Sequence, residues 1–180
     1  MFKRTRRFTS LLILIAGVLI GAPLSAAPAN VPKTPNQKIF ESPDRKCEAV
    51  ILVANESAEF ILEVRDSAEH VLFKKDYTSI NQDGGLTLAQ AQWTSDSQFF
   101  VYSTWHAGGH QAVNSPTFAY SRTANKIFDL QDRLGYIDVS DFTLSSPDVI
   151  HTEVWDIEAQ VSHKTTLHLS EMIAVHRTEN

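Results

Sequence analysis

A short turn motif that occurs three times is the feature that most constrains the fold of this 180-residue chain. The copies are Ser42-Pro43-Asp44, Thr94-Ser95-Asp96 and Ser146-Pro147-Asp148, and successive aspartates are 52 residues apart. Ser, Pro and Asp favour tight turns, and an aspartate can accept hydrogen bonds from backbone amides where the next strand begins. The spacing therefore predicts a repeated unit that starts with a turn followed by a strand.

Between these turns the sequence consists of short segments rich in Val, Ile, Phe, Tyr and Thr. Several alternate with the period of two that is typical of strands, as in 160–169. The predicted strands are 48–54, 59–65, 70–76, 86–93, 98–104, 116–121, 126–130, 148–155 and 160–169. No segment carries a long helical stripe, and 129–141 is expected to hold a turn of helix or a long loop. The predicted fold class is all-β, with antiparallel meanders.

Residues 93–103, which begin Trp-Thr-Ser-Asp and continue into an apolar strand, resemble the opening of a blade in TolB-type, WD-repeat-like β-propellers. In that family a Trp-Ser-Pro-Asp-Gly turn leads into the strand, and the run 42–77 is similar. The resemblance covers 42–169, about two and a half blades at this spacing. The chain departs from the family at the glycine of the turn, which is replaced by Arg45, Ser97 and Val149.

A closed propeller has about four to eight blades, more than this chain can supply. The resemblance therefore implies blade-type meanders packed as a sandwich or as an incomplete, propeller-like domain. We expect one β-rich domain at 42–172 and a flexible tail at 173–180.

The N-terminal residues have the three-part layout of a secretory signal peptide. Four basic residues stand at positions 3, 4, 6 and 7, an apolar stretch follows at 11–22, and small residues come next. We expect a signal peptide at 1–29, cleaved after Ala26 or Ala29, and an extended polar lead-in at 30–41. The apolar stretch is short for a membrane span, so no membrane anchor is expected after cleavage, although a retained anchor is the alternative. This layout predicts a periplasmic or secreted protein.

Charge and cysteine content argue against a nucleic-acid-binding protein and against a fold held by an internal disulfide. Without residues 1–29 the chain has 12 basic and 21 acidic residues, so its surface would repel nucleic acid. Cys47 is the single cysteine, so an internal disulfide cannot form. Its place at the start of an apolar run predicts a buried thiol, with an intermolecular bridge as the alternative.

The most unusual segment follows the strand predicted at 98–104. It contains the candidate binding residues, which are Trp105, His106, Gly108, Gly109, His110 and Gln111. An aromatic ring, two imidazoles and an amide on one glycine-containing loop form a plausible contact surface for a ligand. The alternatives are a metal site and an ordinary hairpin loop. A metal site would use His106 and His110 together with His151, His163 or a carboxylate.

The motifs of nucleophilic catalysis, phosphate binding and dinucleotide binding are missing from the sequence, so no catalytic residue and no cofactor is predicted. Asp129, Asp132, Asp138 and Asp141 could serve acid–base chemistry if folded together, but we interpret them as solvated surface. The sequence therefore favours an exported, soluble binding module for a protein or a small ligand. A metal-dependent enzyme centred on His106 and His110, and a subunit that completes a homo-oligomeric ring, are the alternatives.

Overall fold

The computed structural model describes residues 36–81, 84–108, 116–138 and 140–176. All of them belong to one compact unit that spans 34–180.

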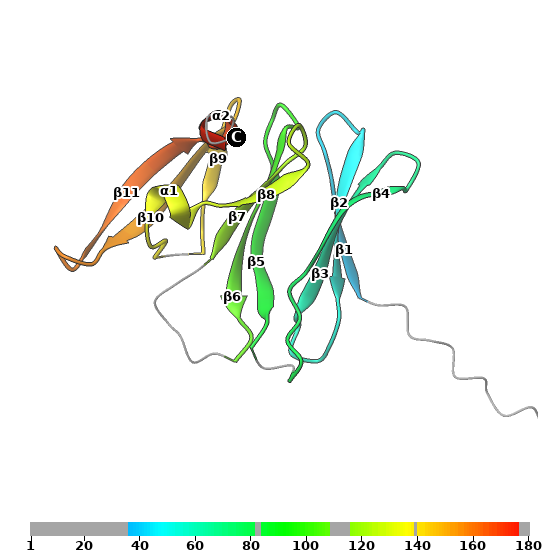
Figure 1. The fold of residues 1–180 in the computed structure, drawn as a ribbon, viewed down its shortest axis with the longest axis horizontal. Coiled ribbons are helices and arrows are strands. Elements are labelled where there is room, and N and C mark those ends of the chain that lie inside the picture. The colour runs from blue at the N-terminus through cyan, green and yellow to red at the C-terminus, as the bar shows by residue number, and fades with distance from the viewer. Residues whose placement is uncertain (1–35, 82–83, 109–115, 139, 177–180) are drawn as a thin grey trace, which may run out of the picture. The chain divides into compact units, whose positions relative to one another are not determined.

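The described residues form three antiparallel sheets, each a simple meander (Figure 1). Sheet 1 contains β1 (Gln37–Glu41), β2 (Cys47–Val53), β3 (Phe60–Asp66) and β4 (Val71–Asp76). Sheet 2 contains β5 (Leu86–Trp93), β6 (Phe99–His106), β7 (Thr117–Ser121) and β8 (Lys126–Asp129). Sheet 3 contains β9 (Thr143–Ser145), β10 (Val149–Asp156) and β11 (Val161–His168). The prediction of an all-β fold of antiparallel meanders is confirmed, and within the described residues the sheets do not close into a barrel.

Each strand predicted from the sequence has a counterpart within two residues of its expected bounds, and helix α1 (Gln131–Leu134) lies in the segment expected to hold a helical turn. Three elements were not predicted. Strand β1 lies in the expected lead-in, β9 is three residues long, and helix α2 (Leu169–His176) follows β11 directly. The expectation that the chain lacks helices beyond a single turn was therefore wrong at α2.

Sheets 1 and 2 bury a shared aromatic and aliphatic core. Strand alternation directs Ala49 and Ile51 of β2, and Leu62 of β3, toward Phe100 and Tyr102 of β6. The ring of Phe100 is 5.3 Å from the ring of Trp93 and 5.7 Å from that of Tyr102, measured between centroids. The second face of sheet 1 therefore lies outside this core.

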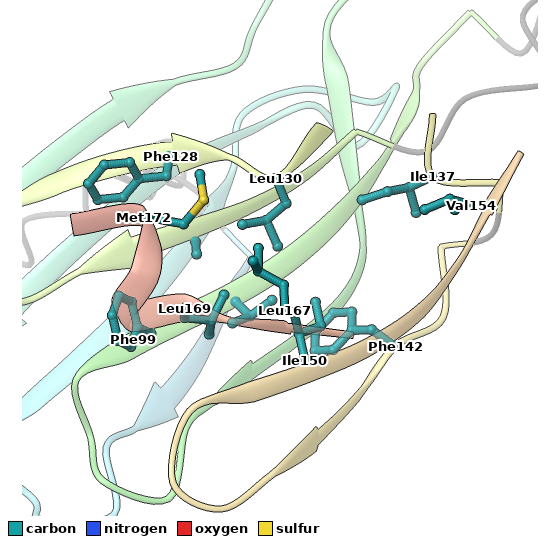
Figure 2. Packing of buried hydrophobic residues seen from close by; sticks show 12 residues of the cluster. Phe99, Phe128, Leu130, Ile137, Phe142, Ile150, Val154, Leu167, Leu169 and Met172 are labelled. Carbon is teal, nitrogen blue, oxygen red and sulfur yellow. The ribbon is translucent and has the colours of Figure 1, made fainter. Parts of the chain in front are cut away.

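Sheets 2 and 3 bury a second core on the opposite face of sheet 2 (Figure 2). Phe99 and Val101 of β6 contribute from one side, and Ile150 and Val154 of β10 contribute from the other. Met172 places α2 in this cluster, which explains why so short a helix forms. Sheet 2 is thus buried on both faces, and Phe99–Thr104 accordingly form an uninterrupted buried run.

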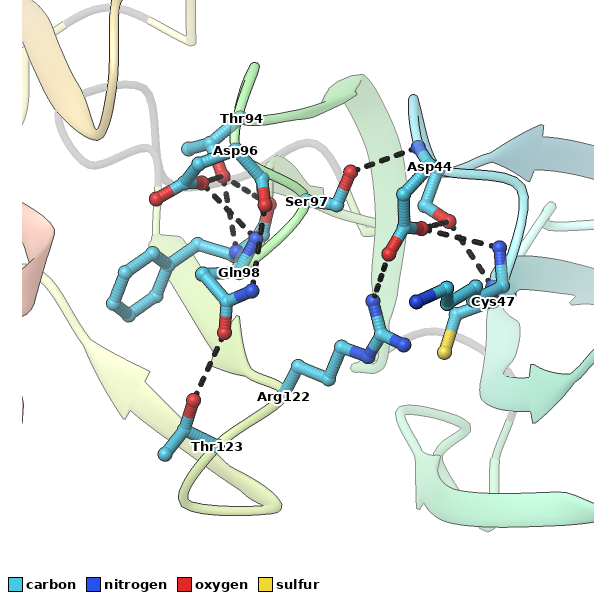
Figure 3. A network of polar contacts seen from close by, with 11 residues as sticks. Asp44, Cys47, Thr94, Asp96, Ser97, Gln98, Arg122 and Thr123 are labelled. Atoms are coloured by element: carbon cyan, nitrogen blue, oxygen red, sulfur yellow. Dashed lines mark hydrogen bonds and ion pairs between the residues drawn. The ribbon is translucent and has the colours of Figure 1, made fainter.

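The repeated turns have the same structure in sheets 1 and 2 (Figure 3). The Ser42 hydroxyl donates to Asp44 over 2.7 Å, and the Thr94 hydroxyl donates to Asp96 over 2.6 Å. In both turns the aspartate also accepts the amide two residues ahead. The residue after each aspartate, Arg45 or Ser97, has a positive φ of 56° or 62°. A positive φ usually favours glycine, so both turns hold the same conformation with a side chain in its place.

The third turn has a different role. The Asp148 carboxylate accepts the amide of Ser170 over 2.9 Å, so it caps the first turn of α2. Burial of Asp148 opposes its ionisation, but the hydrogen bonds from Ser170 and His168 outweigh that effect and lower the pKa. All three copies of the motif therefore precede a strand, but only the turns at Asp44 and Asp96 share the same hydrogen bonds.

The equivalent turns of sheets 1 and 2 also contact each other. The Asp44 amide donates to the Ser97 hydroxyl over 3.0 Å, and the Arg122 guanidinium is 2.7 Å from the Asp44 carboxylate (Figure 3). The hydrogen bond from Arg122 is the main reason that the pKa of Asp44 falls to about 2. The repeat spacing thus brings matching turns of neighbouring sheets together.

The variant Asp44→Asn is expected to lower the free energy of unfolding by about 1 kcal/mol at pH 7, after allowance for solvent screening of this partly exposed pair. A carboxylate with a depressed pKa in the folded state stabilises above its ordinary pKa of 3.8, and this stabilisation is lost as the pH falls toward 2. Urea unfolding at pH 7 and at pH 2.5 measures the difference. A variant as destabilised at pH 2.5 as at pH 7 would contradict this origin.

Cys47 lies in the core between sheets 1 and 2, as predicted from its apolar run. Burial raises the pKa of its thiol, which leaves the group protonated and unreactive at neutral pH.

Candidate functional site

Two of the six candidate residues lie at the end of β6, where they point to opposite faces of sheet 2. His106 is on the face that carries Phe100 and Tyr102, whereas Trp105 is on the other face and is 44% exposed. Gly108 lies in the turn that follows. Gly109, His110 and Gln111 lie outside the described residues. The structure therefore separates His106 from Trp105, and only His106 lines a cavity described below.

A groove of about 530 Å³ crosses the ends of the four strands of sheet 2. Its walls are formed by β5, β6, β7 and β8 and by the segment around α1. The lining residues are Leu86, His106, Pro116, Phe118, Asp129, Gln131, Asp132, Gly135 and Tyr136. This size is in the range of small-molecule sites, and the groove combines an apolar floor with a few polar groups.

The register of sheet 2 explains why distant residues meet in this groove. Leu86 is paired with His106, and Phe118 is paired with Asp129. Because Phe118 is paired with Tyr102, the Phe118–Asp129 pair lies four positions along β6 from the Leu86–His106 pair, on the same face and toward the same end of the sheet. Residues 131–136 come directly after β8 and add the remaining wall.

Asp129 is the residue whose environment differs most from the prediction. It was interpreted as solvated surface, but it is only partly exposed, and one of its oxygens accepts the Gln131 amide over 2.9 Å. Desolvation raises the pKa of Asp129, the Gln131 amide opposes this, and the charge of Asp132 adds to the rise. The groove therefore contains a carboxylate whose charge is poorly compensated.

A pair of tyrosines lies behind the apolar floor. The Tyr77 and Tyr102 hydroxyls are 2.6 Å apart, and the ring of Phe118 is 5.6 Å from Tyr77 and 5.4 Å from Tyr102. Burial raises the pKa of Tyr77 to about 12 and also raises the pKa of Tyr102, and the charge of Asp129 acts in the same direction on both. Both phenols stay protonated and form a rigid aromatic base for the groove.

The loop before β5 is fixed by a buried carboxylate, Glu59, which no sequence motif indicated. Glu59 is fully buried and accepts hydrogen bonds from the amides of Ser79 and Gly85, at 2.9 and 2.7 Å, and from the side chain of Asn55 at 2.8 Å. Burial opposes ionisation of Glu59, but these hydrogen bonds outweigh it and lower the pKa to about 2. The Ala107 amide donates to the Gly85 carbonyl over 2.9 Å. The hydrogen bonds of Glu59 that fix Gly85 therefore also support the turn after His106.

The proposed third metal ligands, His151 and His163, lie in sheet 3, whereas His106 lies at the end of β6 in sheet 2. His151 of β10 contacts the Ser145 hydroxyl over 2.8 Å and lines a second hollow of about 440 Å³, whereas His163 lies on β11. Over the part of the chain that the structure describes, no group of three or more His, Cys, Asp or Glu side chains could hold a metal ion. His110 is outside that part, so the metal alternative stays a prediction.

The variant Asp129→Asn is expected to raise the melting temperature at pH 7, because it removes a partly buried charge and keeps an acceptor for the Gln131 amide. A carboxyl with a raised pKa in the folded state destabilises once the pH exceeds that pKa, so the gain should vanish at pH 3, where the wild-type group is protonated in the folded and unfolded chains. Calorimetry at both values provides the measurement. A loss of stability at pH 7 would show that the ionised group is stabilising.

Comparison with known proteins identifies no family. Neither a protein-family profile nor a curated protein matches the chain. Among solved structures, a Clostridium novyi NT protein described as a conserved lipoprotein is similar over 77% of this chain and 88% of its own, with 18% identity and a TM-score of 0.46. TolB from Acinetobacter baumannii is similar over 72% of this chain and 43% of its own, with 13% identity and a TM-score of 0.26.

The TolB likeness is too weak to confirm the propeller resemblance, and neither structure carries an argument about function. None of the described helices has the length and apolar character needed to cross a membrane.

Proposed function

We propose that this protein is an exported binding module whose ligand occupies the groove at the end of sheet 2. The observation that carries the proposal is the convergence of His106, Asp129 and Tyr136, from three separate segments, on a groove of about 530 Å³ with an aromatic base. The leader-like sequence at 1–29 supports a periplasmic or secreted location.

The lining is suited to binding. It offers hydrogen-bonding groups above an apolar floor, which is the composition of a recognition site. The described lining residues contain no serine, threonine, cysteine or lysine beside a base, so nucleophilic catalysis has no support there.

The alternative function, a subunit that completes a homo-oligomeric ring, is less well supported. Assembly into a ring would bury the outward faces of sheets 1 and 3. Sheet 1 carries Glu63 on that face, paired with Arg65 at 2.7 Å and with Lys74 at 3.0 Å. Glu153 and Lys164 are opposite each other on sheet 3. Packing such faces together would desolvate several charges, whereas the buried faces of the three sheets are apolar.

A ligand-observed NMR screen with a mixture of small aromatic fragments tests the proposal. The double variant His106→Ala/Tyr136→Ala is expected to abolish the binding that the wild type shows, because both side chains line the groove. The matched control is Trp105→Ala, which changes an exposed ring on the same strand but the opposite face. Binding that is lost in the control and kept in the double variant would place the site on the Trp105 side and refute the groove.

A further inference from the structure

We infer that the ligand of the groove carries a positively charged amine or guanidinium group attached to an apolar body. This inference rests on the proposed function, and it names the chemistry that the groove would select.

The charges that line the groove have one sign. Asp129 and Asp132 contribute carboxylates, His106 and Gln131 contribute polar groups, and the described lining contains no lysine or arginine. Arg133, which belongs to α1, is exposed and does not line the groove. An anionic ligand would meet repulsion here, whereas a cation would compensate both carboxylates.

The hydrogen bonds of Asp129 leave room for such a partner. Oδ1 accepts the Gln131 amide, and the structure shows no donor to Oδ2 among the described residues. A carboxylate in a partly desolvated position gains most from a charge-assisted hydrogen bond, which is shorter and stronger than a neutral one. Asp129 is thus the residue from which a cationic ligand would draw most of its electrostatic affinity.

The apolar lining defines the rest of the ligand. Leu86, Pro116 and Phe118 form the floor, and the Tyr136 ring, 47% exposed, stands at the rim. The tyrosine pair keeps the floor in place, because Phe118 packs against both rings. An aromatic or aliphatic body would bury its surface here, and the Tyr136 ring could also face the cation. The groove therefore fits an arylalkyl amine.

Three matched probes separate this inference from the proposed function. Phenethylammonium, 2-phenylethanol and phenylacetate share a body and differ in charge. In a two-dimensional NMR titration of the full mature chain, phenethylammonium should shift the amide signals of His106, Gln131 and Tyr136. The affinity obtained from these shifts should be at least about tenfold higher for phenethylammonium than for the alcohol. Phenylacetate should shift none of these signals.

Asp129→Asn should reduce the affinity for phenethylammonium about tenfold and should reduce the affinity for the alcohol much less, because the alcohol loses only a hydrogen bond from a neutral donor. This variant keeps the acceptor for the Gln131 amide, so the fold is preserved. The control is Glu158→Gln, which removes an exposed carboxylate from the hairpin between β10 and β11 and should change neither affinity. Equal affinity for all three probes, or tighter binding of phenylacetate, overturns the cationic ligand but keeps the groove. Absence of groove shifts with every probe overturns the groove as well.

Discussion

Phe100→Ala is expected to lower the free energy of unfolding by about 3–5 kcal/mol, the largest effect of any single substitution proposed for this chain. Phe100 is fully buried at the centre of the core between sheets 1 and 2, with the rings of Phe40, Trp93 and Tyr102 within 5.7 Å between centroids. Truncation removes the contacts of a whole ring and leaves a cavity, because the three neighbouring rings belong to three different strands and cannot all move inward.

Chemical denaturation at pH 7 measures this effect, and Trp105→Ala on the same strand is the control. Trp105 is 44% exposed, so its removal should change stability by less than about 1 kcal/mol. Similar losses in the two variants would contradict the assignment of Phe100 to the shared core. Loss of sheet 1 alone would show instead that the sheets unfold separately.

Gly85→Ala is the second substitution with a large expected effect. A Cβ atom at this position would lie 2.5 Å from the Glu59 carboxylate and 2.5 Å from the backbone oxygen of Tyr77. Neither atom can move freely, because Glu59 is held by several hydrogen bonds and the Tyr77 carbonyl accepts the Leu86 amide over 3.0 Å. We expect a loss of at least about 1–3 kcal/mol, with local opening of the loop before β5.

Gly84→Ala provides a closely matched control, because its nearest neighbour would be the Ser79 Cβ at 3.8 Å, an ordinary contact. Thermal unfolding of both variants and hydrogen exchange of the Leu86 and Ala107 amides measure the effect. The Gly85 variant should unfold at a lower temperature and exchange these amides faster. If the two variants behave alike, Glu59 does not fix this loop as described.

Most of the strands could be predicted because they depend on local patterns. The buried run in β6 and the alternation of β10 read directly as strands, and the turn motif marked the start of β2 and β6. Elements that depend on tertiary contacts could not be predicted. β1 is a polar edge strand of five residues, and α2 is held by the Asp148 cap from 22 positions earlier in the chain and by burial of Met172.

The candidate site was predicted only at His106. The sequence placed this histidine beside Trp105 and His110, on the assumption that neighbours in a loop act together. Strand alternation instead puts His106 on the same face of sheet 2 as Asp129, which follows 23 positions later, and both residues line the groove. Whether two distant residues line the same groove depends on the register of β6, β7 and β8, and no local sequence motif predicts that register. The one sequence feature that pointed to this site was the group of Asp residues in 129–141, a segment without strand character.

The central claim is that the groove at the end of sheet 2 binds a ligand. The most direct test is a crystal structure of the mature protein grown with saturating phenethylammonium. We expect the aromatic body on Phe118 and the ammonium nitrogen within hydrogen-bonding distance of the Asp129 carboxylate. Ligand bound only in the second hollow, which His151 and Lys164 line, or an empty groove at saturation would contradict this claim.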